Sequence, residues 1–221
     1  MLRKEHTHNF NAPFINQPTD FLPSDLADRT QTNILNSPPD WFPYAVKTSP
    51  MEVVYSKEFP RNITPLLIQD QQQGNFCYRF RRTTPHTNTC QCWWCDFREN
   101  YLQKNFLTSI KKLTHLKNPE LREVFISKYS AGDFLGIHHD DKKGDIAFVL
   151  NLTRNWKPEW GGNLMIQSGP NSWVTLSPKF NSIILLDVHG EGGHNHLVTE
   201  VTQAAPHDRI AITGWVSEEV Q

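Results

Sequence analysis

The chain has 221 residues, of which 38% are hydrophobic, 11% aromatic and 20% charged, and its formal net charge is −1. This length allows one large domain whose core needs no disulfide or metal to fold. The near-neutral charge argues against a nucleic-acid-binding surface as the main activity, and no run approaches the ~20 apolar residues of a membrane span. With four cysteines and no apolar stretch after the charged N-terminus, we expect a cytoplasmic protein without a secretory signal.

The N-terminal part is rich in proline, with seven of the fifteen prolines among the first fifty residues. Because proline disrupts both helix interiors and central strands, we expect residues 1–40 to be an irregular, partly ordered segment and residues 41–221 to form the folded domain. Two strands are expected early in that domain, "MEVVYS" (51–56) and "NFCYRF" (75–80). In the second, the alternation places Phe76, Tyr78 and Phe80 on one face.

Two helices are expected before residue 124. In "NFLTSIKKLTHL" (105–116), Phe106, Ile110 and Leu113 recur at helical spacing. The pair Asn118–Pro119 is typical of a helix start, so "PELREVF" (119–125) is expected to form a short second helix.

From residue 124 the pattern changes to short strands separated by turns. They are rich in β-branched and aromatic residues and read "VFISKYS", "DIAFVLNLT", "GNLMIQ", "WVTLS", "NSIILLDV", "HLVTEV" and "RIAITGWV". Many short strands without intervening helices indicate a sandwich or barrel, of which the double-sheet jelly roll is a leading member. The fold class is therefore expected to be mainly β, a double-stranded β-helix (jelly roll) core over 124–217 with supporting helices and strands over 41–123.

The stretch "GDFLGIHHDD" (132–141) places two histidines before two aspartates. Side chains at i and i+2 of a strand point the same way, so either His138 with Asp140 or His139 with Asp141 could hold one metal ion. Such a pair alone is more often a polar surface turn than a metal site.

Further histidines make the metal hypothesis stronger. "GEGGHNHLVTEV" supplies His189, His194 and His196 near the start of a later strand. Two imidazoles and one carboxylate form the facial triad that non-haem Fe(II) uses with oxygen.

Arg209 is the charged residue on the otherwise apolar strand "RIAITGW". It could extend to solvent at a sheet edge, or point inward and hold the carboxylate of a ligand in bidentate geometry.

The ordered series "YSAGDFLGIHHDD", "FVLNLTRNWKPEWGGNL", "NSIILLD", "HLVTEV" and "RIAITGW" resembles the Fe(II)- and 2-oxoglutarate-dependent dioxygenases of the prolyl hydroxylase family, in its EGL-nine-like and prolyl 4-hydroxylase branch. The resemblance covers about residues 120–217. It implies His138, Asp140 and His196 as the metal ligands. It also implies that the co-substrate pocket is formed by Tyr129, Asn151, Leu164, Val198, Arg209 and Trp215, with Arg209 binding the far carboxylate of 2-oxoglutarate.

The resemblance implies hydroxylation of an unactivated C–H bond, with a prolyl residue of a protein or peptide as the expected substrate and succinate and CO2 as products. Fe(II), 2-oxoglutarate and O2 take part, and ascorbate supports activity. Three alternatives stay open: a free amino acid or other small molecule as substrate, a jelly-roll module that binds a metal without chemistry, and a zinc hydrolase with the same ligands. No nucleic acid or membrane partner is expected.

A second group of potential ligands lies in "HTNTCQCWWCDF" (86–97), which holds Cys90, Cys92 and Cys95. C-x-C-x-x-C suggests a structural zinc, but such sites usually combine two separated knuckles. We therefore expect reduced cysteines packed beside Trp93 and Trp94, with zinc as the less favoured alternative.

Overall fold

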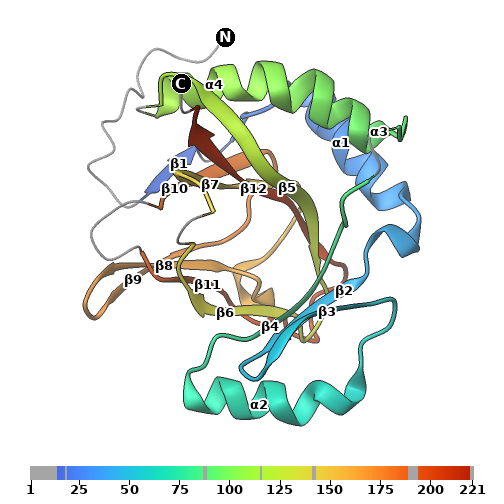
Figure 1. Ribbon diagram of the computed structural model, residues 1–221, viewed down its shortest axis with the longest axis vertical. Coiled ribbons are helices and arrows are strands. Elements are labelled where there is room, and N and C mark those ends of the chain that lie inside the picture. The colour runs from blue at the N-terminus through green and yellow to red at the C-terminus, as the bar shows by residue number, and fades with distance from the viewer. Residues whose placement is uncertain are drawn as a thin grey trace.

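The computed structural model describes residues 14–17, 19–86, 89–114, 116–140, 143–188 and 194–219, and it is built mainly of antiparallel strands (Figure 1). The strands are β1 (Phe14–Gln17), β2 (Tyr44–Thr48), β3 (Met51–Ser56), β4 (Tyr78–Arg82), β5 (Pro119–Tyr129), β6 (Phe134–His138), β7 (Ile146–Asn151), β8 (Leu164–Gly169), β9 (Ser172–Leu176), β10 (Ser182–Asp187), β11 (His196–Val198) and β12 (Arg209–Glu218).

The strands form one curled sheet in the order β1-β10-β7-β12-β5-β4-β6-β11-β8-β9, with the hairpin β2–β3 joined to it through β4. The short strand β4 pairs with β5 through Arg81 and Arg82 and with β6 through Tyr78 and Arg79, so it connects the two layers of the curled sheet. Figure 1 shows these layers, with β1, β10, β7, β12 and β5 above and β6, β11, β8 and β9 below. This arrangement confirms the predicted jelly-roll core.

Helices cover the outer face of the upper layer (Figure 1). They are α1 (Ser24–Asn36) and one long helix made of α3 (Trp93–Asp96), the π-helical stretch η3 (Phe97–Phe106) and α4 (Leu107–Leu113). The main core lies between helices and sheet, where Phe106 packs on Phe148 of β7 with ring centroids 4.6 Å apart. Since helices cover one face of the upper layer and the pocket lies on the other, β10 is buried along nearly its whole length.

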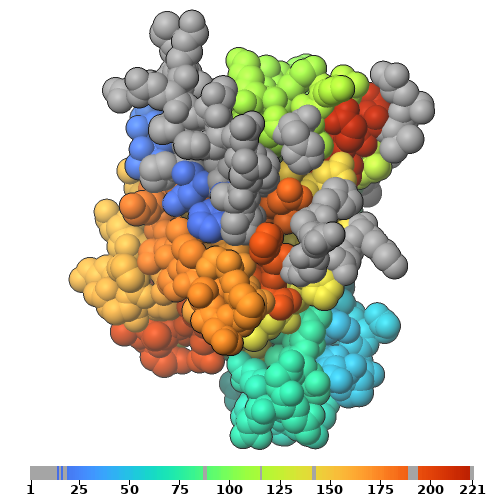
Figure 2. All heavy atoms as spheres, turned by 90° about the vertical axis from the view of Figure 1, so that its left-hand side faces the viewer, coloured from blue at the N-terminus to red at the C-terminus, as the bar shows by residue number. Residues whose placement is uncertain are grey.

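The remaining helices are short or lie outside this core. Helix α2 (Thr64–Gln73) lies at the opposite end of the molecule from α4, as the view from the side of the β8–β9 hairpin also shows (Figure 2). The described residues also form the 3-10 turns η1 (Pro39–Trp41), η2 (Arg61–Ile63) and η4 (Pro158–Trp160). Among the described residues, no helix is both long and apolar enough to cross a bilayer.

Two local predictions differ from the structure. The segment expected to be irregular contains α1, because its prolines flank the helix at Pro23 and Pro38 and none lies within residues 24–36. The predicted helix over 119–125 is wrong: these residues begin strand β5. The peptide NH of Asn118 donates to the Glu218 side chain, and β5 pairs with β12 over most of its length, so long-range pairing overrides the local capping signal.

The predictions around 51–56, 105–116 and most jelly-roll strands are confirmed. The strand expected over 75–80 begins only at Tyr78, and β11 covers only the first three residues of "HLVTEV". Helix α2 had no counterpart among the predicted elements, since its apolar residues give only a weak helical periodicity. The division into an N-terminal segment over 1–40 and a domain over 41–221 stays a prediction.

Candidate functional site

His138, Asp140 and His196 come together where β6 and β11 pair. His138 ends β6, His196 begins β11, and these two residues lie opposite each other in the antiparallel register. His138 Nε2 lies 3.6 Å from one carboxylate oxygen of Asp140, and His196 Nε2 lies 3.3 Å from the other. The three donor atoms all lie within 4.8 Å of one another, a spacing suited to one metal ion.

Close strand packing sets the position of this group. The Gly136 NH donates to the Cys77 carbonyl just ahead of β4, and a Cβ at Gly136 would lie 2.5 Å from that same oxygen. Only glycine therefore allows the two chain segments to approach this closely. His138 follows two residues later on the same face of β6, so the close approach of the two segments helps to position the His138 imidazole.

Hydrogen bonds orient both imidazoles. His138 Nδ1 donates to the Gly136 carbonyl at 3.0 Å, and His196 Nδ1 donates to the His194 carbonyl at 3.1 Å. A carbonyl can only accept, so each ring carries its proton on Nδ1, and Nε2 is left to face Asp140. This is the arrangement in which a backbone carbonyl fixes the tautomer of a metal-binding histidine.

The environment of the group favours a neutral histidine beside a charged carboxylate. Burial, followed by the neighbouring His196, lowers the pKa of His138 to about 4, although Asp140 acts in the opposite direction. Burial alone would raise the pKa of Asp140. The hydrogen bond with His196 and the positive charges around it outweigh burial and hold the pKa of Asp140 well below its usual range. A deprotonated carboxylate and an unprotonated imidazole nitrogen are the forms that bind metal.

One polar atom of this group lacks a hydrogen bond within the described residues. Asp140 is only 5% exposed, and its Oδ1 accepts no hydrogen bond, although Lys143 Nζ lies 3.2 Å away. A buried carboxylate oxygen without a hydrogen bond is costly unless a cation completes its environment. The donor set of two imidazoles and one carboxylate therefore fits Fe(II), with open positions for further ligands.

The other histidines of the two motifs have different positions. His139 is exposed and does not line the pocket, and His194 directs Nδ1 to the Gln167 carbonyl at 3.2 Å. Asp141 and His189 lie outside the described residues. Of the two possible pairs, the structure thus places His138 and Asp140 beside His196. That these residues bind a metal stays a prediction.

A pocket extends from this group between the two layers of the sheet. Five of the six predicted co-substrate residues line it together with the three candidate ligands: Tyr129, Leu164, Val198, Arg209 and Trp215. Asn151, the sixth, is fully buried and does not line the pocket, but its side-chain oxygen accepts a hydrogen bond from Arg209 Nη2 at 3.4 Å. Asn151 therefore lies behind the arginine, where it can contact a pocket ligand only through Arg209.

Arg209 points inward and has no carboxylate partner among the described residues. It is 2% exposed, its Nε donates no hydrogen bond, and its guanidinium lies 5.0 Å from the centroid of the Tyr129 ring. Burial lowers the pKa of Arg209, yet a guanidinium remains charged in proteins. A buried positive charge without a counterion in a pocket is a binding position for a carboxylate.

Among the pocket residues that were not predicted as site residues, three lie beside predicted ones. Phe76 stacks on the His138 ring at 4.9 Å, Thr213 lies between Arg209 and Trp215 on the inner face of β12, and Lys143 places Nζ 4.3 Å from the Trp215 ring. The alternation of aromatic residues in 75–80 could have identified Phe76, and the shared face of β12 could have identified Thr213. The sequence carries no comparable signal for Lys143.

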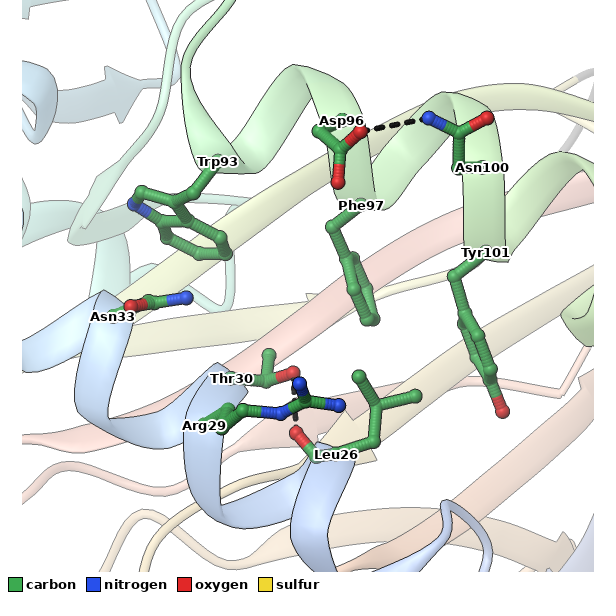
Figure 3. A pocket seen from close by; sticks show the side chains of 9 residues that line it. All are labelled: Leu26, Arg29, Thr30, Asn33, Trp93, Asp96, Phe97, Asn100 and Tyr101. Carbon is green, nitrogen blue, oxygen red and sulfur yellow. Dashed lines mark hydrogen bonds between the residues drawn. The ribbon is translucent and has the colours of Figure 1, made fainter.

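A second hollow lies between α1 and the long helix, away from these residues. Figure 3 shows Trp93, Phe97 and Tyr101 pointing across it toward Leu26 and Arg29 of α1. None of the predicted site residues lines this hollow, so it is not the candidate active site.

Comparisons with known proteins agree with this geometry. Residues 124–217 match the family model described as the 2OG-Fe(II) oxygenase superfamily. No curated protein sequence matches the chain.

Solved structures resemble the whole fold. A Pseudomonas putida prolyl-4-hydroxylase has a TM-score of 0.59 and 17% identity, with 95% of each chain covered. A Trichoplax adhaerens prolyl hydroxylase, solved with a peptide fragment of the hypoxia inducible factor oxygen degradation domain, has a TM-score of 0.62 and 16% identity over 94% of this chain and 84% of that one. A Burkholderia pseudomallei oxidoreductase of the 2OG-Fe(II) oxygenase family has a TM-score of 0.60 and 13% identity over 94% and 85%.

At these identities the solved structures establish the fold, and the family match covers the jelly-roll strands together with His138, Asp140 and His196. Residues 124–217, which form most of the jelly roll, therefore match the 2OG-Fe(II) oxygenase superfamily, whose members work with Fe(II), 2-oxoglutarate and O2.

Proposed function

We propose that this oxygenase hydroxylates a prolyl residue of a protein or peptide, with release of succinate and CO2. His138, Asp140 and His196 hold Fe(II), and Arg209 holds the far carboxylate of 2-oxoglutarate. The observation that carries the proposal is that the three candidate ligands line one pocket with the buried Arg209, which has no carboxylate partner among the described residues. A metal-binding module without chemistry has no need for both features.

The pocket residues position the reactants and restrict water. Arg209 offers a fork of donors that matches a carboxylate, and Asn151 supports it from behind. Burial raises the pKa of Tyr129, so its hydroxyl stays protonated and is available as a hydrogen-bond donor to the co-substrate. Leu164, Val198 and Trp215 form apolar walls. Iron, when bound, supplies the redox chemistry of oxygen activation and C–H hydroxylation.

A prolyl substrate is supported by the aromatic side of the pocket. Phe76, Tyr78 and Phe80 lie along β4 and the residues before it, with successive ring centroids 5.5 and 5.3 Å apart. Aromatic-lined grooves are the surfaces on which proline-rich segments dock, because the pyrrolidine ring is apolar and rigid. The structurally similar Trichoplax adhaerens enzyme was solved with a peptide.

The test combines binding with turnover in the purified protein. Fe(II) and then 2-oxoglutarate are added without oxygen, while the weak visible metal-to-ligand charge-transfer band is followed. Oxygen, ascorbate and a panel of proline-containing peptides are then added, and succinate and peptide mass are measured. We expect the band, 2-oxoglutarate turnover stimulated by some peptides, and the gain of one oxygen atom on proline.

Each result has a distinct meaning. Absence of the band in folded, iron-loaded protein would contradict the binding of 2-oxoglutarate at this site. Metal analysis would then test the zinc-hydrolase alternative. A band together with stimulation by free proline or another small molecule, and by no peptide, would contradict the peptide substrate while retaining the oxygenase chemistry.

A further inference from the structure

A second cluster of potential metal ligands lies between β4 and α3. It consists of His86, Cys90, Cys92 and Cys95, and their ligand atoms all lie within 4.8 Å of one another. His86 follows β4, Cys90 and Cys92 precede α3, and Cys95 lies within its first turn. The structure thus supplies, through His86, the fourth ligand that the C-x-C-x-x-C motif lacks.

The spacing of the four atoms matches tetrahedral coordination. His86 Nδ1 lies 3.6 Å from the Cys90 sulfur, 3.2 Å from the Cys92 sulfur and 3.6 Å from the Cys95 sulfur. In a tetrahedron with Zn–N and Zn–S bonds of about 2.05 and 2.3 Å, the nitrogen lies about 3.6 Å from each sulfur. The four atoms therefore surround a position that one zinc ion can occupy.

Hydrogen bonding alone does not explain this convergence. The imidazole nitrogen Nδ1 has one proton or one lone pair and can form one good hydrogen bond, yet three sulfurs surround it. All four cysteines are free thiols, so no disulfide accounts for the short distances. A shared cation is the arrangement that uses all four atoms at once.

We propose that His86, Cys90, Cys92 and Cys95 form a closed structural zinc site, separate from the jelly-roll centre. Three soft thiolates and one imidazole are a donor set that favours zinc, and four protein ligands leave no position for a substrate. On binding, Zn²⁺ replaces the three thiol protons, which pass to solvent, and the complex carries one net negative charge.

The surroundings of the cluster indicate what the metal holds together. The Trp41 ring meets the His86 ring edge-on, with centroids 4.7 Å apart, and lies 6.4 Å from the Trp93 ring. Trp93 Nε1 donates to Ser37 Oγ at 3.0 Å, just past the end of α1. Zinc would therefore fasten the segment after β4 to the start of the long helix, where Trp93 contacts α1 and lines the hollow of Figure 3.

The test is the metal content of the full-length protein by inductively coupled plasma mass spectrometry. The double variant His138→Ala/His196→Ala removes the jelly-roll centre, and we expect it to retain about one equivalent of zinc. In that background, Cys90→Ser/Cys92→Ser/Cys95→Ser should lose at least about nine tenths of the zinc, because serine is a poor zinc ligand. Cys77→Ala, which removes the cysteine outside the cluster, is the matched control and should retain it.

A second measurement on the wild-type chain covers the case in which the triple variant fails to fold. An organomercurial that reacts with thiols is titrated into the folded protein with a zinc-sensitive dye present, and we expect zinc release as three thiols react. Undiminished zinc in a folded triple variant would overturn the proposal. Reaction of the wild-type thiols without release of zinc would also overturn it. The same holds if the wild-type protein contains an internal disulfide, or if it contains inorganic sulfide together with iron.

Discussion

The two ligand clusters of this chain differ in number, donor type and setting. The jelly-roll cluster has three donors: two imidazoles on the paired strands β6 and β11, and one carboxylate just after β6, all lining one pocket. The cluster before α3 has four donors, three of them sulfur, held on a loop and the first turn of a helix. A three-ligand centre leaves coordination positions for reactants, whereas a four-ligand tetrahedral centre is complete. The first arrangement suits chemistry and the second suits stability.

The supporting structure follows the same division. Around the jelly-roll cluster, backbone carbonyls hold both histidines, and the pocket supplies a buried positive charge in Arg209. Around the cysteine cluster, Trp41 packs on the His86 ring and beside Trp93, which donates to Ser37, so that three segments of the chain are connected. We therefore expect substitutions at the first cluster to change turnover and substitutions at the second to change the unfolding temperature.

The largest expected effect on turnover comes from the jelly-roll ligands. Asp140→Ala removes the anionic ligand and should lower Fe(II)-dependent 2-oxoglutarate turnover by more than about 100-fold, the upper range for outer-shell partners alone. His139→Ala is the matched control, because this neighbouring histidine is exposed and lies outside the pocket. Turnover and iron content are measured for both variants. Equal losses in the two variants would contradict the assignment of His138 and Asp140.

The next effect concerns the co-substrate. Arg209→Ala should raise the KM for 2-oxoglutarate by about 10- to 100-fold, because hydrogen bonds to charged groups contribute about 1.5–3 kcal/mol. Arg209→Lys should restore part of the affinity, since it keeps the charge but loses the bidentate geometry. Steady-state kinetics over a range of 2-oxoglutarate concentrations separates KM from kcat. An unchanged KM in folded Arg209→Ala would place the carboxylate elsewhere.

A smaller effect is expected behind the arginine. Asn151→Ala removes the acceptor for Arg209 Nη2 and should raise the KM for 2-oxoglutarate about 2- to 10-fold, since that single hydrogen bond is long. Asn151 also donates to Ser182 Oγ at 3.2 Å, so Ser182→Ala is the control that removes this contact, together with the hydrogen bond from Ser182 Oγ to the Lys179 carbonyl, and leaves the contact with Arg209. If Ser182→Ala raises KM equally, the effect arises from local packing and Asn151 does not act through Arg209.

The smallest expected effect on turnover, and the largest on stability, comes from removal of zinc. Loss of a ligand present at about 1,000 times its Kd costs about 4 kcal/mol, which lowers the unfolding temperature of a chain of this size by about 10 °C. Cys95→Ser should reproduce this shift, while iron-reconstituted protein at low temperature keeps turnover within about twofold. Differential scanning calorimetry and 2-oxoglutarate turnover measure the two quantities. Loss of turnover without a shift in unfolding temperature would remove the distinction between the clusters.

The sequence was informative where a local rule and the final structure coincide. Short runs of β-branched and aromatic residues between turns predicted most jelly-roll strands, and the helical spacing of Phe106, Ile110 and Leu113 predicted the helix that ends at Leu113. Local rules failed at Pro119, where the helix-start signal was present but β12 was available as a pairing partner. They also gave too little weight to proline-free residues 24–36, which form α1.

At the candidate site, the sequence by itself determined the donor types and, through the ordered motifs, the resemblance to the family that residues 124–217 match. Alternation could not choose between His138 with Asp140 and His139 with Asp141, because it is the same in both registers, and only the resemblance implied the first pair. The pairing of β6 with β11 decided which imidazoles share a space. Likewise, C-x-C-x-x-C was visible in the sequence, but the position of His86 beside it depends on how the segment after β4 meets α3. Spacing along a chain determines which face a side chain occupies, whereas contacts between distant segments depend on packing that only the folded chain establishes.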